Sequence, residues 1–148
     1  MPSTHLSLHY HLVFSTKQRE RWLIDPHRAR VHEYVGGIVR NMRGVAHAMG
    51  GVEDHVHAFI GLRATHCLAD VMRELKADSS AWIHRELGIK EFSWQEGYGG
   101  FTVSASLIQP VRRYVMNQVE HHRRVAFEDE YVRMLRRGLV EYDDRYLW

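Results

Sequence analysis

The sequence predicts an α+β fold of the ferredoxin-like type, in which the elements follow the order β-α-β-β-α-β and a further helix comes last. Three observations lead to this prediction: strict apolar alternation over 6–14, helical apolar spacing over 31–42 and 68–83, and a strand-like run over 53–61. In this topology the first and third strands are central neighbours in an antiparallel sheet, and both helices cover one face. The other face of the sheet is left uncovered by these two helices, so we expect a functional site there.

Length and composition indicate one globular domain spanning residues 1–148. Hydrophobic residues make up 45% of the chain, and no apolar run approaches the roughly 18 residues of a membrane helix. Residues 1–5 lack the pattern of a signal peptide. Cys67, the single cysteine, excludes an internal disulfide and suits a reducing compartment. We therefore expect a cytoplasmic protein that does not act on membranes.

Basic residues are gathered in short clusters, although the net charge is only +2. In chain order these clusters are 17–21, 112–113, 123–124 and 136–137. Such runs usually form solvated surface, but several of them in one small domain favour a nucleic-acid partner.

The first strand is expected over 6–14 and the first helix after Asp25-Pro26, where the aspartate is the N-cap and the proline the first helical residue. The residues expected on the inner face of the strand are Leu6, Leu8, Tyr10, Leu12 and Phe14. Apolar side chains at helical spacing then continue over 31–42, and Gly44 ends this helix.

Two further strands, 45–49 and 53–61, form a hairpin whose loop begins at Gly50-Gly51. Thr65 is expected to cap the second helix, whose apolar stripe occupies 68–83.

The remaining chain contains a glycine- and aromatic-rich loop over 91–100 and a short fourth strand over 101–104. A third helix is expected from Ser106 towards Phe127, with helical character returning over 131–137. The acidic and aromatic tail, 141–148, is expected to pack on the body of the protein or on a partner.

His55 and His57 are two residues apart in the third strand and therefore share one face, which we expect to look outward. The apolar residues of the opposite face are Val56, Ala58 and Ile60. Imidazoles about 6.6–7 Å apart at the Cβ level can converge on one ion. His9 and His11 of the neighbouring first strand are expected beside them, so this face of the sheet is rich in histidine.

Tyr114 and Gln118 lie four residues apart in the third predicted helix and share one of its faces. Tyrosine can attack phosphorus, and the glutamine amide oxygen can be a third metal ligand beside the histidine pair. Each feature alone has an ordinary explanation as packing, and His121-His122 is most simply a solvated pair. Their combination in a small basic domain indicates metal-assisted phosphodiester chemistry.

The sequence resembles the single-tyrosine HUH transposases of the insertion-sequence 200/605 group and their REP-associated relatives, in which two histidines flank a bulky hydrophobic residue. The resemblance covers almost the whole chain. Its segments are Tyr10–Lys17, Asp54–His57, Trp94–Ser104 and Tyr114–His122. Valine at position 56 is a smaller hydrophobe than isoleucine, and Pro110 could alter how the tyrosine helix moves.

The resemblance implies a metal-dependent transposase that cleaves and rejoins single-stranded DNA at element ends through a 5′-phosphotyrosine intermediate. Tyr114 would attack the scissile phosphate, while His55, His57 and Gln118 would hold Mg²⁺ or Mn²⁺. Similar proteins are homodimers that recognise hairpins at the element ends. In them, the tyrosine helix of one subunit can complete the site of the other.

The charge pattern adds candidate phosphate contacts: Lys17, Arg19, Arg112 and Arg113. Trp94 and Tyr98 could stack on a base or anchor their loop, and loop anchoring is the expected role.

Two alternative functions stay open. A domesticated relative would process host repeats with the same chemistry, and a non-catalytic module would only bind single-stranded nucleic acid. Binding modules of this fold expose aromatic residues on the central strands, whereas these strands present histidines. Histidine-triad nucleotide hydrolases are excluded, because Phe59 stands where they need a third histidine.

Overall fold

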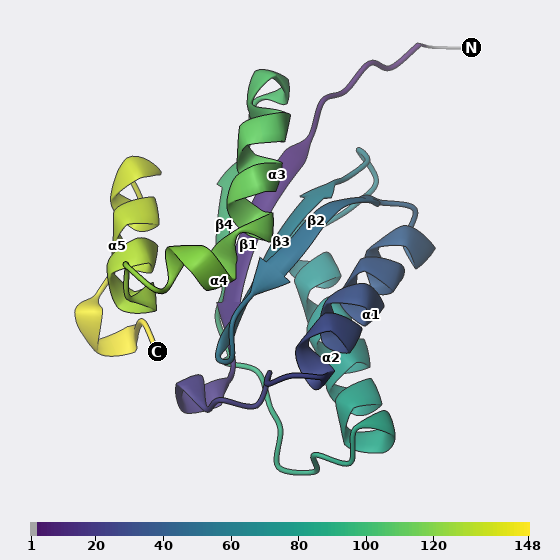
Figure 1. The fold of residues 1–148 in the computed structure, drawn as a ribbon. Helices are drawn as coiled ribbons and strands as arrows, with labels where there is room; N and C mark the ends of the chain where they lie inside the picture. Colours follow the sequence, from purple (N-terminus) through teal and green to yellow (C-terminus); the bar gives the residue numbers. More distant parts are fainter. Residues whose placement is uncertain (1–2) are drawn as a thin grey trace.

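Four strands form one antiparallel sheet with the order β2-β3-β1-β4 in the computed structural model, which describes residues 3–148 (Figure 1). Their bounds are β1 His9–Ser15, β2 Val45–Gly51, β3 His55–Gly61 and β4 Gly99–Thr102. β1 and β3 are central neighbours, and their register pairs Val13 with His57 and Ser15 with His55. This arrangement confirms the predicted ferredoxin-like α+β fold.

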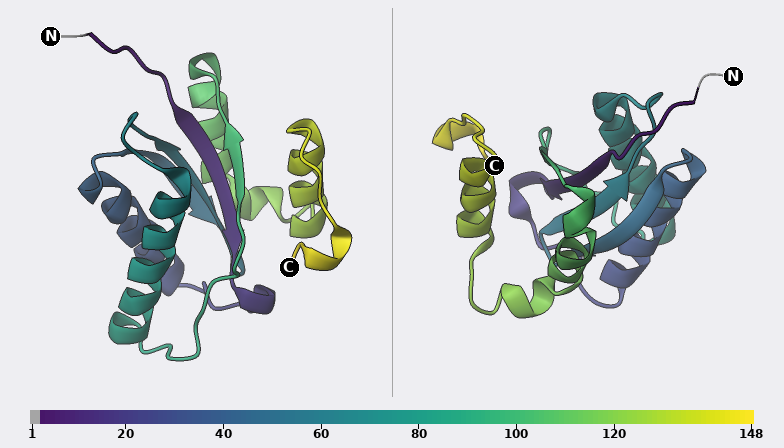
Figure 2. Two further views of the ribbon diagram at one scale, coloured as in Figure 1. Left: turned by 180° about the vertical axis from the view of Figure 1, so that it is seen from behind. Right: turned by 90° about the horizontal axis from the view of Figure 1, so that it is seen from above.

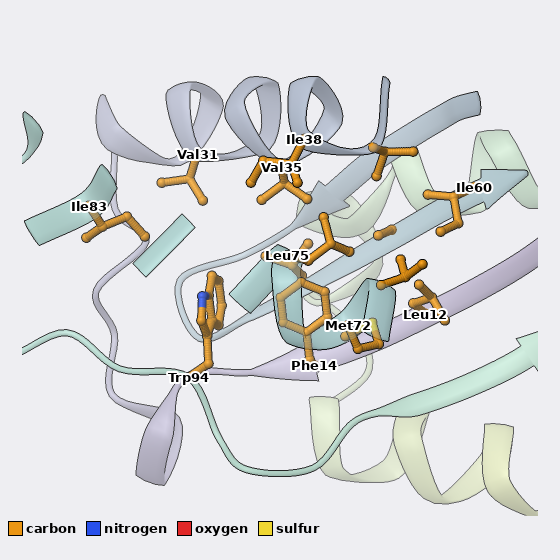
Figure 3. Close-up of a cluster of buried hydrophobic side chains, with 14 of the residues drawn as sticks. Leu12, Phe14, Val31, Val35, Ile38, Ile60, Met72, Leu75, Ile83 and Trp94 are labelled. Carbon is orange, nitrogen blue, oxygen red and sulfur yellow. The ribbon is translucent and has the colours of Figure 1, made fainter. Parts of the chain in front are cut away.

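α1 (His27–Asn41) and α2 (Leu68–Glu86) form a hydrophobic core with one face of the sheet. Figure 3 shows their apolar side chains meeting those of β1 and β3. Alternation and helical spacing predicted most of its buried residues: Leu12, Phe14, Val31, Val35, Ile38, Val39, Val56, Ala58, Ile60, Val71, Met72, Leu75 and Ile83. Leu23, Phe92 and Trp94 complete the cluster from loops outside these patterns. Each large apolar side chain buried here contributes about 1.5–3 kcal/mol.

α3 (Ile108–Met116) packs on the other face, over β2 and β3, and lies behind β1 when the molecule is seen from behind (Figure 2, left). Val115 of α3 is fully buried against Phe59. A Cβ atom on Gly50 would lie 1.8 Å from the carbonyl oxygen of Val115, so glycine is needed for α3 to approach β2 this closely. α5 (Phe127–Arg137) packs beside β1 and β4 (Figure 1).

Several strand boundaries differ from the prediction: β3 begins at His55 rather than Glu53, and β4 ends at Thr102 rather than Ser104. β1 begins at His9 rather than Leu6, whose side chain is 55% exposed. β2 continues through Gly50–Gly51, and β4 begins at Gly99, two residues before the predicted start. Glycine lies inside these strands because neighbours approach closely: a Cβ on Gly99 would be 2.8 Å from the Tyr131 ring.

The predicted helix caps are also wrong. α1 begins at His27 without a side-chain cap, and the Asp25 carboxylate instead accepts a hydrogen bond from Arg28 at 3.4 Å. α2 follows Cys67, so the exposed Thr65 lies outside its first turn. Both helices are held by their buried apolar stripes, and neither depends on the expected cap.

The continuous helix expected from Ser106 towards Phe127 is broken. α3 ends at Met116, Asn117 adopts φ −103° and ψ 24°, and α4 covers only Gln118–His121. A turn then leads to α5, and the ring of His122 bonds the Val125 carbonyl at 2.7 Å within this turn. The break lets the chain cross from α3 over β2 and β3 to α5 beside β4 (Figure 1).

The C-terminal tail packs on the body of the protein, which was one of the two arrangements expected for it. The Trp148 ring lies 5.3 Å from the Phe127 ring and 5.6 Å from the Tyr131 ring, measured between centroids. Within residues 3–148, no helix combines the length and the apolar character that crossing a bilayer requires.

Candidate active site

His55 and His57 point away from the α1–α2 core, as predicted, because they alternate along β3 with the core residues Val56 and Ala58. Both side chains are nevertheless 0% exposed. The ring of Phe127 from α5 stacks on His55, with centroids 3.6 Å apart and planes 2° from parallel. The predicted direction of the pair is therefore confirmed, but the pair is not exposed, because the C-terminal helix covers it.

Five side chains bring nitrogen and oxygen atoms together over β3. The Nε2 atom of His57 lies 3.0 Å from Oε1 of Glu130, and that of His122 lies 3.3 Å from the same oxygen. The Nε2 atoms of His55 and His122 are 3.1 Å apart. Gln118 Oε1 lies 2.9 Å from His122 Nε2, and its side chain is buried. The three histidines and the carboxylate place one atom each within 4.8 Å of all the others.

This donor set fits a divalent metal ion. Imidazole nitrogen together with carboxylate and amide oxygen is a ligand combination that first-row divalent metals accept. The donors come from β3, from the α4 region and from α5, so tertiary packing holds them together. Glu130 supplies a negative charge that is only 2% exposed and needs positive partners.

A second layer of polar groups orients the two β3 histidines. His11 Nε2 lies 2.7 Å from His57 Nδ1, and Asp54 Oδ1 lies 2.8 Å from His55 Nδ1. In both rings the Nδ1 atom is bonded away from the cluster while Nε2 points into it. Such outer contacts fix the orientation of histidines that bind metals.

His9 does not join this cluster, contrary to the expectation of four histidines side by side. It pairs with Gly61 at the end of β3, and its Nδ1 atom lies 3.0 Å from Nε2 of His47 on β2. A Cβ on Gly61 would stand 3.3 Å from that His47 atom, so the absent side chain leaves room for the pair.

Tyr114 is joined to the cluster through Glu130. The Tyr114 hydroxyl donates a hydrogen bond to Oε2 of Glu130, while Oε1 faces the histidines. His121 Nε2 lies 3.0 Å from the same Oε2 atom and 3.4 Å from the tyrosine oxygen. One carboxylate thus connects a tyrosine hydroxyl to the donor set.

The protonation of these groups follows from burial and from Glu130. Burial lowers the pKa of His57 to about 4 and that of His11 to about 3, so both rings are neutral at pH 7. Burial and the Glu130 carboxylate raise the pKa of Tyr114 above its ordinary value. Burial alone would raise the pKa of Glu130, but hydrogen bonds with His122 and His57 hold it well below its usual range. The site therefore contains an ionised carboxylate and a protonated tyrosine.

Four residues that the sequence singled out lie together: His55, His57, Tyr114 and Gln118. Although the helix breaks at Asn117, the Gln118 amide still donates to the Tyr114 carbonyl oxygen at 3.3 Å, so the two residues stay close. This juxtaposition joins the middle of the chain to its C-terminal third.

The candidate phosphate contacts are not brought together. Lys17 and Arg19 lie on the short helical turn η1 (Lys17–Arg19), the purple turn after β1, at the end of the sheet away from the start of α3 (Figure 1). Arg19 bonds Glu128 at 2.5 Å, and its guanidinium lies 5.1 Å from the centre of the Trp148 ring. Arg112 and Arg113 are exposed on α3.

The sequence prediction missed Glu130, His121 and His122. The interpretation of His121-His122 as a solvated pair is wrong, because both rings contact the Glu130 carboxylate. Their spacing gave a signal, since they follow Tyr114 by seven and eight residues and so continue its helical face. Glu130 gave none, because it is one of three consecutive acidic residues at the start of α5.

Trp94 anchors the loop before β4, as expected. The Trp94 side chain is 7% exposed, and its Nε1 atom donates to Ser79 Oγ at 2.9 Å. Gln95 accepts a hydrogen bond from the Ser15 backbone at 2.6 Å, and the Lys76 ammonium donates to the loop carbonyls. Trp94 is therefore unavailable for base stacking.

Comparison with known proteins places these features in a family. The sequence profile described as "Transposase IS200 like" matches residues 4–118. No curated protein matches the chain. One similar solved structure is a presumed transposase from Deinococcus radiodurans R1, with 23% identity and a TM-score of 0.66 over 80% of this chain and 95% of that one.

Another is the REP-associated tyrosine transposase bound to a REP hairpin, with 14% identity and a TM-score of 0.58 over 82% of this chain and 73% of that one. At these identities the two structures share the fold. The profile match covers well over half of the chain and includes the segments around His55, His57, Tyr114 and Gln118. The chain therefore belongs to the IS200-like transposase family.

Proposed function

We propose that this transposase cleaves and rejoins single-stranded DNA at element ends through a covalent link between Tyr114 and a 5′ phosphate. The observation that carries the proposal is the Tyr114 hydroxyl beside a largely buried set of side chains that could hold a metal ion. Residues 1–148 would act as one endonuclease domain, because Glu130 bonds His57 across 73 positions of the chain.

His55, His57 and Gln118 would hold a divalent metal ion, and His122 and Glu130 are positioned to join or replace Gln118 as ligands. Three imidazoles argue against Mg²⁺ and so favour Mn²⁺ of the two ions, because Mg²⁺ demands oxygen ligands in near-ideal octahedral geometry. When bound, the ion would polarise the phosphodiester and stabilise the charge that develops on it.

Tyr114 would supply the nucleophilic oxygen. Its proton has an acceptor in place, because the hydroxyl already donates to Glu130 Oε2. The tyrosine oxygen would bond to phosphorus, the bond from phosphorus to the 3′ oxygen would break, and the 3′ oxygen would leave as a hydroxyl after taking up a proton. The phosphotyrosine link keeps the phosphodiester energy for rejoining.

Hairpin DNA is the partner we propose, supported by the REP hairpin in the structural neighbour. A homodimer remains part of the proposal. The cluster needs no second subunit for its donors, because His55, His57, Gln118, His122 and Glu130 all come from one chain. We therefore favour assembly of each site within one chain.

The test uses the purified protein and its Tyr114→Phe variant with labelled single-stranded DNA from the flanks of its own gene. Each is incubated with Mn²⁺, Mg²⁺ or a chelator, and covalent adducts are separated on a denaturing gel. A metal-dependent adduct in the parent alone supports the proposal. An adduct that survives in Tyr114→Phe refutes the assignment of Tyr114.

Binding of hairpin DNA without any adduct would favour the non-catalytic binding module. A domesticated repeat-processing enzyme would give the same adduct, but from dispersed genomic repeats rather than from sequences flanking the gene. Substrates of both origins are therefore compared in the same assay.

A further inference from the structure

Tyr114 borders a cavity of about 250 Å³ between α3 and α5. The wall on α5 is formed by Glu130, Arg133, Met134 and Arg137, whose spacing of three and four residues places them on one helical face. The cavity volume is far above the roughly 10–15 Å³ in which one water molecule fits. It is therefore large enough for a phosphodiester group beside the tyrosine.

The charge of the cavity favours an anion. Within residues 3–148, neither Arg133 nor Arg137 is ion-paired, whereas the arginines that form ion pairs are Arg19, Arg28, Arg73, Arg85, Arg123 and Arg145. Glu130 is the one acidic residue among the lining residues, and its oxygens already bond His57, His121 and Tyr114. Two guanidinium groups against one hydrogen-bonded carboxylate leave the cavity with a net positive charge.

We propose that Arg133 and Arg137 bind a backbone phosphate of single-stranded DNA in this cavity, beside the Tyr114 hydroxyl. The proposal rests on the proposed function, because it takes Tyr114 as the nucleophile. Guanidinium suits this role, since its planar fork can donate two hydrogen bonds to one phosphate. The apolar side of the cavity, Val111 and Met134, would lie against the sugar.

Both arginines lie beyond Gln118, where the family profile ends. They belong to a C-terminal segment that also contributes Glu130 and Phe127 to the site. This segment would therefore add a phosphate contact that lies outside the matched part of the chain, next to the tyrosine and histidines that lie inside it.

Arg136 provides a matched control on the same helix. It is exposed, like Arg133 and Arg137, but it does not line the cavity beside Tyr114. It lines a neighbouring cavity with Asp144 and Trp148, which Arg133 also borders. A general attraction between a basic helix and DNA would depend on all three arginines alike.

The experiment measures binding of fluorescein-labelled (dT)20 by anisotropy over a salt series, with a chelator present so that only binding is observed. Arg133→Gln and Arg137→Gln are each expected to weaken binding about five- to tenfold at low salt and to reduce the log–log salt slope by about 0.7, the value for one phosphate contact on a single strand. Arg136→Gln should change affinity less than about twofold. Circular dichroism and thermal unfolding confirm that each variant is folded.

Equal losses in all three variants, or no loss in Arg133→Gln and Arg137→Gln, would overturn the proposal. The Tyr114 adduct assay separates it from the proposed function. If the two variants lose (dT)20 binding while the parent forms no adduct, the phosphate site stands and the nuclease assignment fails. If adducts form in both variants at the parent's rate and half-saturating DNA concentration, the arginine site fails and Tyr114 stands.

Discussion

The Nε2 atom of His11 on β1 lies 2.7 Å from the Nδ1 atom of His57 on β3. Both residues face the side of the sheet that α3 and α5 cover, and His11 is only 6% exposed. Since the Nδ1 side of His57 is bonded to His11, its Nε2 atom is directed at Glu130 and the other donors. This contact links the strand alternation seen in the sequence to the orientation of a proposed metal ligand.

Replacing His11 is therefore expected to weaken metal binding. His11→Phe removes the bond to His57 Nδ1 but keeps a ring in the buried space. Loss of such an outer contact lowers metal affinity about 10–100-fold, which calorimetric titration with Mn²⁺ measures. His9→Phe is the control, because His9 lies on the same strand but bonds His47. Equal Mn²⁺ affinities in His11→Phe and the parent would contradict this role.

Glu130 is expected to contribute to the metal site directly. Glu130→Gln keeps the shape of the side chain but removes the charge that faces His57 and His122. We expect Mn²⁺ affinity to fall about tenfold or more and adduct formation by Tyr114 to slow. Glu128→Gln, which changes an exposed carboxylate paired with Arg19, should leave both quantities unchanged. The assignment fails if the two variants behave alike.

Close packing of α3 on β2 predicts a strong effect at Gly50. In Gly50→Ala the new Cβ would lie 1.8 Å from the Val115 carbonyl oxygen, so α3 must move. Overpacking of this kind costs about 1–3 kcal/mol of unfolding free energy, and displacement of α3 would take Tyr114 away from Glu130. Urea unfolding and the adduct assay measure the two effects. Gly97→Ala is the control, since its nearest neighbour would be 4.0 Å away, and comparable losses there would exclude the packing explanation.

Local patterns in the sequence predicted the sheet, its two covering helices and the shared faces of His55 with His57 and of Tyr114 with Gln118. That the two pairs form one site followed from the family resemblance. Alternation and helical spacing are properties of neighbouring residues, so they can be read directly from the chain. Burial of the histidine pair could not be predicted in this way, because it depends on Phe127, which lies 72 positions beyond His55. Such a contact is fixed by tertiary packing.

The helix break had no local signal either. Asn117 is neither proline nor glycine, and helical spacing runs through it, so tertiary contacts overrode the local preference. The break nevertheless determines the site, because it turns the chain towards α5 and brings Glu130 to Tyr114.

His32 on α1 predicts how stability depends on pH away from the site. Burial, and then the nearby Arg28, lower its pKa to about 4, and its buried Nε2 atom has no hydrogen-bond partner within residues 3–148. In the unfolded chain the pKa of this histidine is about 6.5. Between pH 6.5 and 4, His32 is therefore protonated in the unfolded state but neutral in the folded state. The contribution of neutral His32 to the free energy of unfolding is complete above pH 6.5. It is lost as the pH falls towards 4, and the loss is at most about 3 kcal/mol. Urea unfolding of the metal-free protein at pH 7 and pH 4.5 should show a smaller loss for His32→Leu than for the parent. His5→Gln, at an exposed position, should keep the parent's loss, and a His32→Leu variant that also keeps it would contradict the prediction.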